Sequence, residues 1–173
     1  MIGISEGLPI IHTTVRLKNS NIVSGHPETF IREYCTIHDS ILESGCEIYE
    51  RVSIKKSKIG KETVINTGNY VEFSQLGNNV LVGPNCSIVG VFHQIKKDGY
   101  GVEKQDSFNR VVIEDGAFIG ACSVILPGVK IGKGTVIGAG TVVTHNIPPL
   151  HICFGTPPNQ TIENLKKWLN RDK

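Results

Sequence analysis

The amino-acid sequence predicts an all-β fold, a parallel β-helix built from six-residue units. The main observation is a run of β-branched aliphatic residues spaced strictly by six between residues 113 and 143. A helix repeats every 3.6 residues and a strand every two, so neither alone produces this period. A unit of strand plus turn does produce it, and stacked units bury one aliphatic column. The column comprises Ile113, Ile119, Ile125, Ile131, Ile137 and Val143.

A second column, offset by four residues, supports the same interpretation. Its members are small or β-branched, and glycine directly follows three of the aliphatic anchors, at Gly120, Gly132 and Gly138. An ordinary buried sheet is the alternative, but it does not require two columns in phase at a spacing of six. The second column comprises Ala117, Ser123, Val129, Thr135, Thr141 and Ile147.

The first half of the chain repeats with a regular slip. Two steps of six are followed by a step of five, so one coil takes 17 residues, and the short units carry Ser40, Ser57 and Ser74 at the same place. We expect one corner of each coil to be shortened there, because a small hydroxyl residue suits a tight turn. Residues 1–30 show no clear repeat, although the first strand is expected at 10–12. The anchors are Ile31, Ile37, Leu42, Ile48, Ile54, Ile59, Ile65, Val71, Leu76, Val82 and Ile88.

The repeat breaks once, at His93, and resumes at Ile113. Residues 93–110 are therefore predicted to form a loop extruded from the coil wall, and such a loop is usually functional because the scaffold does not need it. We expect a β-helix domain over 1–158 and a C-terminal helix and tail over 159–173. A short helix is predicted at 162–170, capped by Thr161, and its apolar face is expected to cover the last coil.

Composition excludes several classes of function. The 173 residues suit one domain, and 18 basic against 16 acidic residues leave no electrostatic footprint for nucleic acid or an anionic membrane. No apolar run approaches the length of a membrane span, and the N-terminus lacks a signal-peptide pattern, so we expect a cytoplasmic protein. The five cysteines form no CxxC pair, which favours buried thiols over a zinc site or a disulfide.

Three features can carry chemistry. His93 stands at the break in the repeat, and a neutral imidazole there suits a general base, although a surface histidine without a task is the alternative. Asn66 offers a donor and an acceptor for a sugar hydroxyl or a carbonyl, but it also suits a turn. Small residues around Ala121 and Ala139 expose backbone amides to an extended ligand, or serve the corner geometry alone.

Residues 111–148 resemble the C-terminal coils of the hexapeptide-repeat acyltransferases. The resemblance covers about residues 59–158 and is nearest to the branch of the galactoside, maltose and nodulation-factor acetyltransferases, with the xenobiotic acetyltransferases close by. The run GNNVLVGPN at 77–85, the histidine after a short spacer, the loop and the terminal coils follow that family's order. The histidine with its loop is the more specific part of the match.

The resemblance implies a left-handed β-helix that assembles as a homotrimer, with active sites between subunits and acetyl-CoA as co-substrate. It places the general base on His93 and a substrate-binding role on Asn66. The pantetheine chain of CoA is expected near Ala121, Ala139 and Thr144, with His145 beside it. The sequence departs from the family at three places: His145 replaces a frequent lysine, Asn159 a frequent arginine, and Phe92 the usual glycine before the histidine.

Three functions are compatible with these residues. The favoured one is an acetyltransferase that acts on a sugar, a nucleotide-linked amino sugar or a similar small acceptor, without a metal. The second is a metal-dependent hydratase like the γ-class carbonic anhydrases, which needs three histidines where this chain offers His93 and has Ala117 at a relevant position. The third is a non-catalytic β-helix scaffold, because fold does not imply function.

Overall fold

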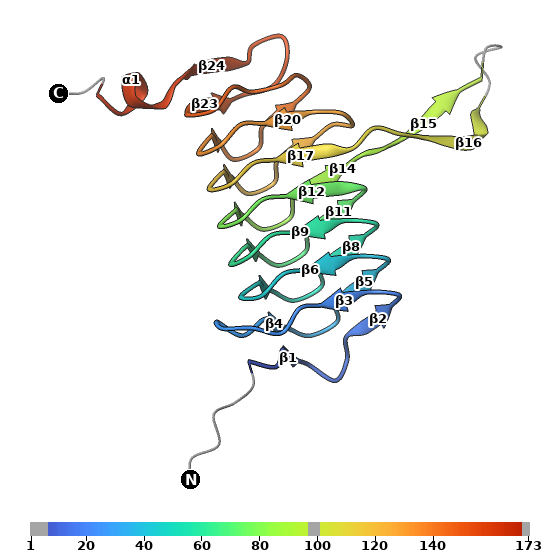
Figure 1. The fold of residues 1–173 in the computed structure, drawn as a ribbon. Coiled ribbons are helices and arrows are strands. Elements are labelled where there is room, and N and C mark those ends of the chain that lie inside the picture. The colour runs from blue at the N-terminus through green and yellow to red at the C-terminus, as the bar shows by residue number, and fades with distance from the viewer. Residues whose placement is uncertain (1–6, 97–100, 171–173) are drawn as a thin grey trace.

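The structure, a computed structural model, describes residues 7–96 and 101–170. Residues 1–6 and 171–173 of the two expected domains, and residues 97–100 of the expected loop, lie outside the described residues. The chain winds as a left-handed parallel β-helix whose coils stack into a prism (Figure 1). Its three walls are sheets A, B and C, and successive strands of each coil enter them in that order.

Each sheet pairs strands of successive coils in register, so equivalent residues lie above one another. Sheet A contains β1 (Ile10–Ile11), β4 (Phe30–Ile31), β7 (Glu47–Ile48), β10 (Val64–Ile65), β13 (Leu81–Val82), β18 (Phe118–Ile119), β21 (Val136–Ile137), β23 (His151–Phe154) and β24 (Thr161–Asn164). Sheet B contains β2 (Arg16–Lys18), β5 (Thr36–His38), β8 (Ser53–Lys55), β11 (Tyr70–Glu72), β14 (Ser87–Val89), β19 (Val124–Ile125) and β22 (Val142–Val143). Sheet C contains β3 (Asn21–Ile22), β6 (Ile41–Leu42), β9 (Lys58–Ile59), β12 (Ser74–Leu76), β17 (Val111–Ile113) and β20 (Lys130–Ile131).

The core is the stack of aliphatic anchors, as the period predicts. Every predicted anchor from Ile31 to Val143 is at most 2% exposed, and the second column from Ala117 to Ile147 is buried with it. The coils approach so closely that a Cβ on Gly120 would lie 2.5 Å from the backbone nitrogen of Ala139, which explains the glycine after this anchor. Four of the five cysteines are buried free thiols, and burial raises the pKa of Cys46 to about 12.

A ladder of serines stabilises the shortened corner between sheets B and C. The backbone N–H of Ser57 donates to the Ser40 Oγ at 3.1 Å, and that of Ser74 donates to the Ser57 Oγ at 3.0 Å. Each hydroxyl in turn donates to the carbonyl two residues earlier in its own coil. Ser20 extends the ladder to the first coil, which the sequence period does not reveal. The predicted tight corner is confirmed, and its serines also bond between coils.

Replacing Ser57 by alanine is expected to lower the free energy of unfolding by about 1–3 kcal/mol. The change leaves the buried N–H of Ser74 without its acceptor and removes the bond to the Lys55 carbonyl. Denaturant unfolding measures the loss, with Ser87→Ala on the outer face of β14 as the matched control, expected within about 0.5 kcal/mol of wild type. Equal stability of the two variants would contradict a stabilising role for the ladder.

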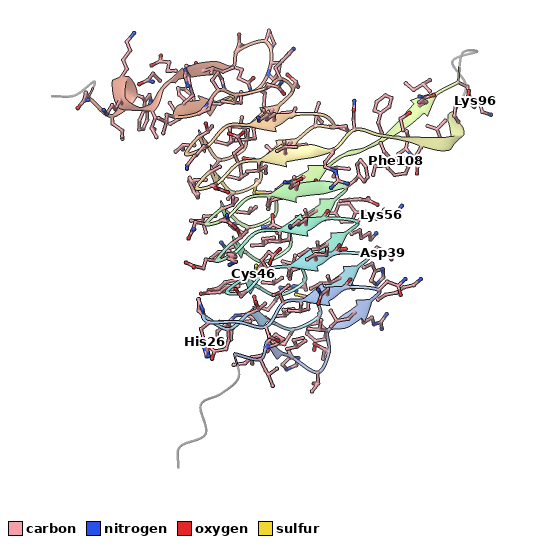
Figure 2. All side chains as sticks on the ribbon, in the orientation of Figure 1. His26, Asp39, Cys46, Lys56, Lys96 and Phe108 are labelled. Atoms are coloured by element: carbon pink, nitrogen blue, oxygen red, sulfur yellow. The ribbon has the colours of Figure 1, made fainter. Side chains whose placement is uncertain are left out.

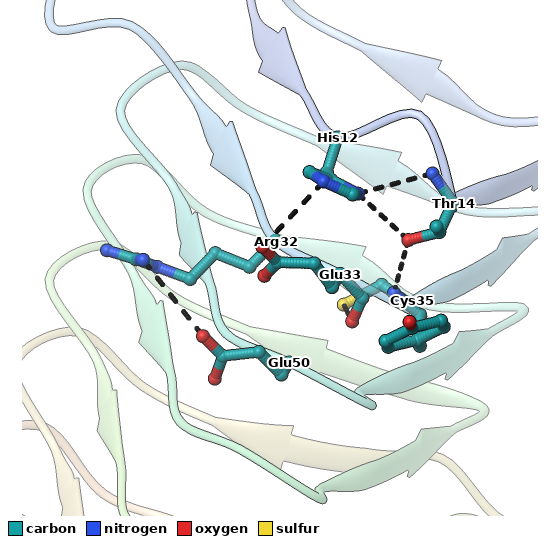
Figure 3. A network of polar contacts seen from close by, with 7 residues as sticks. His12, Thr14, Arg32, Glu33, Cys35 and Glu50 are labelled. Carbon is teal, nitrogen blue, oxygen red and sulfur yellow. Dashed lines mark hydrogen bonds and ion pairs between the residues drawn. The ribbon is translucent and has the colours of Figure 1, made fainter.

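The repeat begins one coil earlier than the sequence period indicates. Strands β1, β2 and β3 form a complete first coil, joined to the next one by polar side chains (Figure 3). The Thr14 Oγ1 accepts the backbone N–H of Tyr34 at 2.8 Å and lies 2.9 Å from the His12 Nδ1. The His12 Nε2 lies 3.7 Å from the Glu33 carboxylate. These polar contacts supplement the strand pairing and the packing of Ile11, Val15 and Ile22 against the core, while Leu8, Ile10 and Leu17 remain exposed.

The C-terminal segment differs from its prediction. Strand β24 occupies 161–164 and pairs antiparallel with β23, so helix α1 (Leu165–Leu169) begins later than expected, and Asn164 rather than Thr161 caps it. The predicted helix over 162–170 is wrong at its start because the backbone of β23 offers these residues a strand partner. The helix buries no residue, and it is β24 that covers the edge of the last coil. No helix in the described residues is long and apolar enough to cross a membrane.

Candidate active site

A β-hairpin projects from the edge where the chain passes from sheet B to sheet C (Figure 1). We call it the arm; it consists of β15 (Val91–Ile95) and β16 (Val102–Phe108), which pair antiparallel. It occupies the position of the predicted extruded loop but starts at Val91 and is a paired hairpin rather than an irregular loop. Its register is irregular between His93 and Ile95, so the strand is distorted beside the histidine.

His93 lies directly opposite Asp106 in the arm. The His93 Nδ1 is 2.6 Å from the Asp106 Oδ1, and the histidine side chain is 67% exposed, so its ring reaches solvent. A carboxylate at Nδ1 favours the tautomer with its proton there, which leaves the Nε2 lone pair available. The pair can thus take a proton from a hydroxyl or an amine placed at Nε2.

The arm also exposes large apolar side chains. Phe92, Ile95, Val102 and Phe108 are between 48% and 70% exposed in the single chain. A depression of about 350 Å³ beside them is lined by Gln94, Glu103, Asp106 and Ser107. The candidate general base therefore lies on a hairpin whose apolar side chains are largely exposed to solvent in the single chain.

Asn66 lies on a different edge of the prism, where the chain passes from sheet A to sheet B. It follows β10, is half-buried, and its Nδ2 donates to the Val82 carbonyl at 2.9 Å. Its neighbour Asn69 is buried and bonds to the carbonyls of Asn66 and Gly83 and to the backbone N–H of Cys86. One amide hydrogen of Asn66 therefore holds the corner, while its Oδ1 accepts no hydrogen bond from the described residues.

The four residues expected near CoA divide between the same two edges. Ala121 and Ala139 follow β18 and β21 on the edge between sheets A and B, on the side of Asn66. Thr144 and His145 follow β22 on the edge between sheets B and C, on the side of the arm, with the Thr144 Oγ1 2.8 Å from the His145 Nδ1. His145 is exposed, as is Ala139.

Within one chain, the structure does not bring the six predicted residues together. Sheet B separates the two edges by strands of two or three residues, about 10 Å of extended backbone. His93 and Asn66 therefore lie on different edges of the prism and do not adjoin each other in one chain. We call His93, Thr144 and His145 the arm half of the candidate site and Asn66, Ala121 and Ala139 the corner half; the members of each half share an edge but belong to coils that are up to two or three apart.

Residues 110–145 match the family described as bacterial transferase hexapeptide (six repeats). These residues carry the hexapeptide repeat of that family. A galactoside O-acetyltransferase of Lactococcus lactis subsp. lactis is 38% identical over 109 residues, which cover 57% of this chain and 51% of the relative. The solved structure of a hexapeptide-repeat-containing acetyltransferase from Vibrio cholerae superposes with a TM-score of 0.56 at 25% identity, covering 86% of this chain and 72% of that one.

A perosamine N-acetyltransferase variant from Caulobacter crescentus, solved with CoA and GDP-perosamine, has a TM-score of 0.53 at 22% identity and covers 91% of this chain and 53% of that one. At that identity the likeness shows the fold. The chain spans about half or less of the length of the curated relatives it matches. The two acetyltransferases named above, from Lactococcus lactis and Vibrio cholerae, share the repeat with this chain, and the predicted fold class is confirmed.

Asp106 is the residue of the site that the sequence period does not identify. It lies 13 residues after His93 in a segment without any repeat, and only the antiparallel register places the two side chains in contact. A signal was present in principle, since a hairpin over 91–108 would oppose residues equidistant from its centre. The metal-dependent alternative gains no ligand at Ala117, whose methyl group is buried in the core.

Proposed function

We propose that this protein transfers an acetyl group from acetyl-CoA to a hydroxyl or amine of a sugar or a similar small acceptor. The observation that carries the proposal is the His93–Asp106 pair on the arm of a chain related to a galactoside O-acetyltransferase. The scaffold alternative has no use for a carboxylate-oriented, solvent-facing histidine. One imidazole base serves either an oxygen or a nitrogen acceptor.

His93 acts as the general base in this proposal. Its Nε2 takes the proton from the acceptor, whose oxygen or nitrogen forms the new bond to the acetyl carbonyl carbon. The same Nε2 then returns the proton to the leaving sulfur as the carbon–sulfur bond breaks, so His93 ends as it began. Asp106 is a positioning residue that holds the ring through Nδ1 and stabilises its protonated form.

Acetyl-CoA supplies the activated acetyl thioester. The residues present fit an extended chain such as the pantetheine of CoA, because Ala121 and Ala139 are small and Gly140, next to Ala139, is exposed with open space around its Cα. The basic residues frequent in the family for the phosphates are replaced by His145 and Asn159. We infer that Lys166 and Lys167, both exposed in α1, contribute positive charge at that end.

We further propose that the protein is a homotrimer with three equivalent sites. The split supports this, because the arm half of one copy needs the corner half of another. A contact between two different edges is heterologous, and three such contacts close a ring around a threefold axis. The exposed Phe92, Ile95 and Val102 give the arm an apolar surface for the neighbouring copy.

The assay that tests the function follows release of the CoA thiol with a panel of sugars and amino sugars. Transfer to at least one member, with a product of the expected mass, supports the proposal. Absence of both CoA binding and transfer across the panel would instead favour the scaffold.

Two inactive variants are expected to restore each other if the site is shared. His93→Ala removes the base from the arm half, and Ala121→Trp fills the corner half, so each homotrimer is expected to be inactive. In mixed trimers from equal amounts, about one quarter of the interfaces pair an intact arm with an intact corner, so activity should recover to about a quarter of wild type. The measurement is thiol release after co-refolding.

The control for this mixing experiment combines His93→Ala with a second arm variant, Asp106→Ala. Both lesions then lie in the same half of the site, so no interface receives an intact arm and no recovery is expected. Absence of recovery in the first mixture as well would contradict a site shared between copies.

A further inference from the structure

Two cations and two aromatic rings gather where the arm leaves the prism. We call Lys56, Phe73, Phe108 and Arg110 the foot cluster. The rings of Phe73 and Phe108 meet edge to face with centroids 5.2 Å apart. The Lys56 Nζ lies 5.1 Å from the Phe108 centroid, and the Arg110 guanidinium lies 4.6 Å from that of Phe73. Figure 2 shows Lys56 and Phe108 on the same edge of the prism, below the arm.

The backbone at this corner is held in an unfavourable conformation for two members of the cluster. Lys56 and Phe73 both have φ of 47°, in the left-handed region. The equivalent corner residues of the preceding coils are Asn19 and Asp39, types that tolerate this region. Lysine and phenylalanine tolerate this region less well, as do the residues at other corners of the prism, such as Tyr34, Arg51 and Glu62. Lysine and phenylalanine thus replace asparagine and aspartate at this corner in the coils nearer to the arm.

The charge of the foot cluster is not neutralised by neighbouring acids. Among the described side chains, neither Lys56 nor Arg110 has a carboxylate within ion-pair distance. The acidic groups on adjacent elements already have partners: Asp106 contacts His93, Glu72 accepts from the Tyr70 hydroxyl, and Asp39 accepts from Asn19. Two positive charges therefore face solvent together.

The foot cluster lies beside the candidate base. Phe108 opposes Val91 and Asp106 opposes His93, so Phe108 and Asp106 are two residues apart and project from the same face of the arm. Two residues of strand span about 7 Å. Phe108 of the cluster and Asp106, the partner of the candidate base, are thus neighbours on one face of the arm.

We propose that the acceptor carries a phosphate group, which Lys56 and Arg110 bind while His93 deprotonates the reacting hydroxyl or amine. This inference rests on the proposed acetyl transfer and specifies its substrate class. Arginine presents a planar fork that matches phosphate oxygens, and lysine adds a mobile point charge. The aromatic pair holds both cations in place through their ring faces.

The test compares neutral and phosphorylated forms of the same sugar. Galactose and glucosamine are each assayed beside their 1-phosphates and their uridine-diphosphate derivatives, which separates a free sugar phosphate from a nucleotide-linked sugar. We expect wild type to prefer one phosphorylated class by about tenfold or more in kcat/KM, the size of one charge-assisted contact. The double variant Lys56→Gln, Arg110→Gln is expected to bring the ratio close to one.

The matched control is Lys61→Gln, an exposed lysine on the edge between sheets C and A, which should keep the wild-type ratio. Three results would overturn the inference. They are a wild-type ratio near one, an equal loss for neutral and phosphorylated sugars in the double variant, and a weaker affinity for CoA in that variant. The second would mean that the cluster only braces the arm, and the third that it binds the phosphates of CoA.

The phosphate site can be tested even if the protein does not transfer an acetyl group to any of these sugars. If no sugar is acetylated, isothermal titration of galactose 1-phosphate and glucosamine 1-phosphate into wild type and the double variant still tests the cluster. Binding by wild type that the double variant lacks supports a phosphate site, and absence of binding by wild type overturns it.

Discussion

Replacing His93 by alanine is expected to lower kcat/KM for acetyl transfer by about 10²–10⁴-fold, the usual contribution of a general base. The variant retains the arm but lacks the imidazole Nε2 that takes the proton of the acceptor. Because the side chain is 67% exposed, we expect the free energy of unfolding to change by no more than about 0.5 kcal/mol. Steady-state thiol release and denaturant unfolding measure the two quantities on the same preparation.

Two further variants sharpen this prediction. Asp106→Asn is expected to lower kcat with little change in the acceptor KM, because Asp106 acts on the reaction through the His93 ring. His12→Ala is the matched control, since His12 is also an exposed histidine beside a carboxylate, that of Glu33, but lies on the first coil. Full activity of His93→Ala would remove the histidine from the mechanism and leave the fold assignment unchanged.

The second large effect is expected in the core. Replacing Leu42 by alanine should lower the free energy of unfolding by about 2–5 kcal/mol, because it leaves a cavity in the closely packed aliphatic column. Leu42 is fully buried in β6, between anchors of the coils above and below. Coils contact only their neighbours, so a defect in one of them weakens the interfaces on both sides.

The control is the preceding residue in the same strand. Ile41 points outward and is 42% exposed, so Ile41→Ala is expected to cost less than about 1 kcal/mol. Urea or guanidinium unfolding of the two variants beside wild type measures the difference. Similar losses for both would mean that the inward and outward faces of the strand are not distinguished as the register shows.

The scaffold was predictable because its signal is local and repeated. Each unit of five or six residues places one aliphatic residue at the same inward position, so the anchors from Ile31 to Val143 identify the core without any knowledge of long-range contacts. The step of five marks the corner where Ser40, Ser57 and Ser74 bond to one another. The 17-residue period does not identify the first coil, because its strands lie 20 residues from their partners and its anchors remain partly exposed.

The C-terminal helix shows where local preference loses to tertiary pairing. Residues 161–164 have an acceptable helical pattern, yet the backbone of β23 presents unpaired hydrogen-bonding groups next to them. Pairing four residues there satisfies these groups, and the helix keeps only Leu165–Leu169. A sequence pattern contains no information about a strand edge that exists only after the coils have stacked.

The β-helix, its buried columns, the shortened corner and the one break at His93 can be predicted from the amino-acid sequence, because each of these depends on residues at fixed short spacings. Long-range contacts alone make the break a paired arm, bring Asp106 to His93, and join Lys56 and Phe73 to Phe108 and Arg110 at the foot of the arm. The tertiary structure also places His93 and Asn66 on different edges. These relations join residues of separate coils and strands, so their proximity follows from register and stacking rather than from any period along the chain.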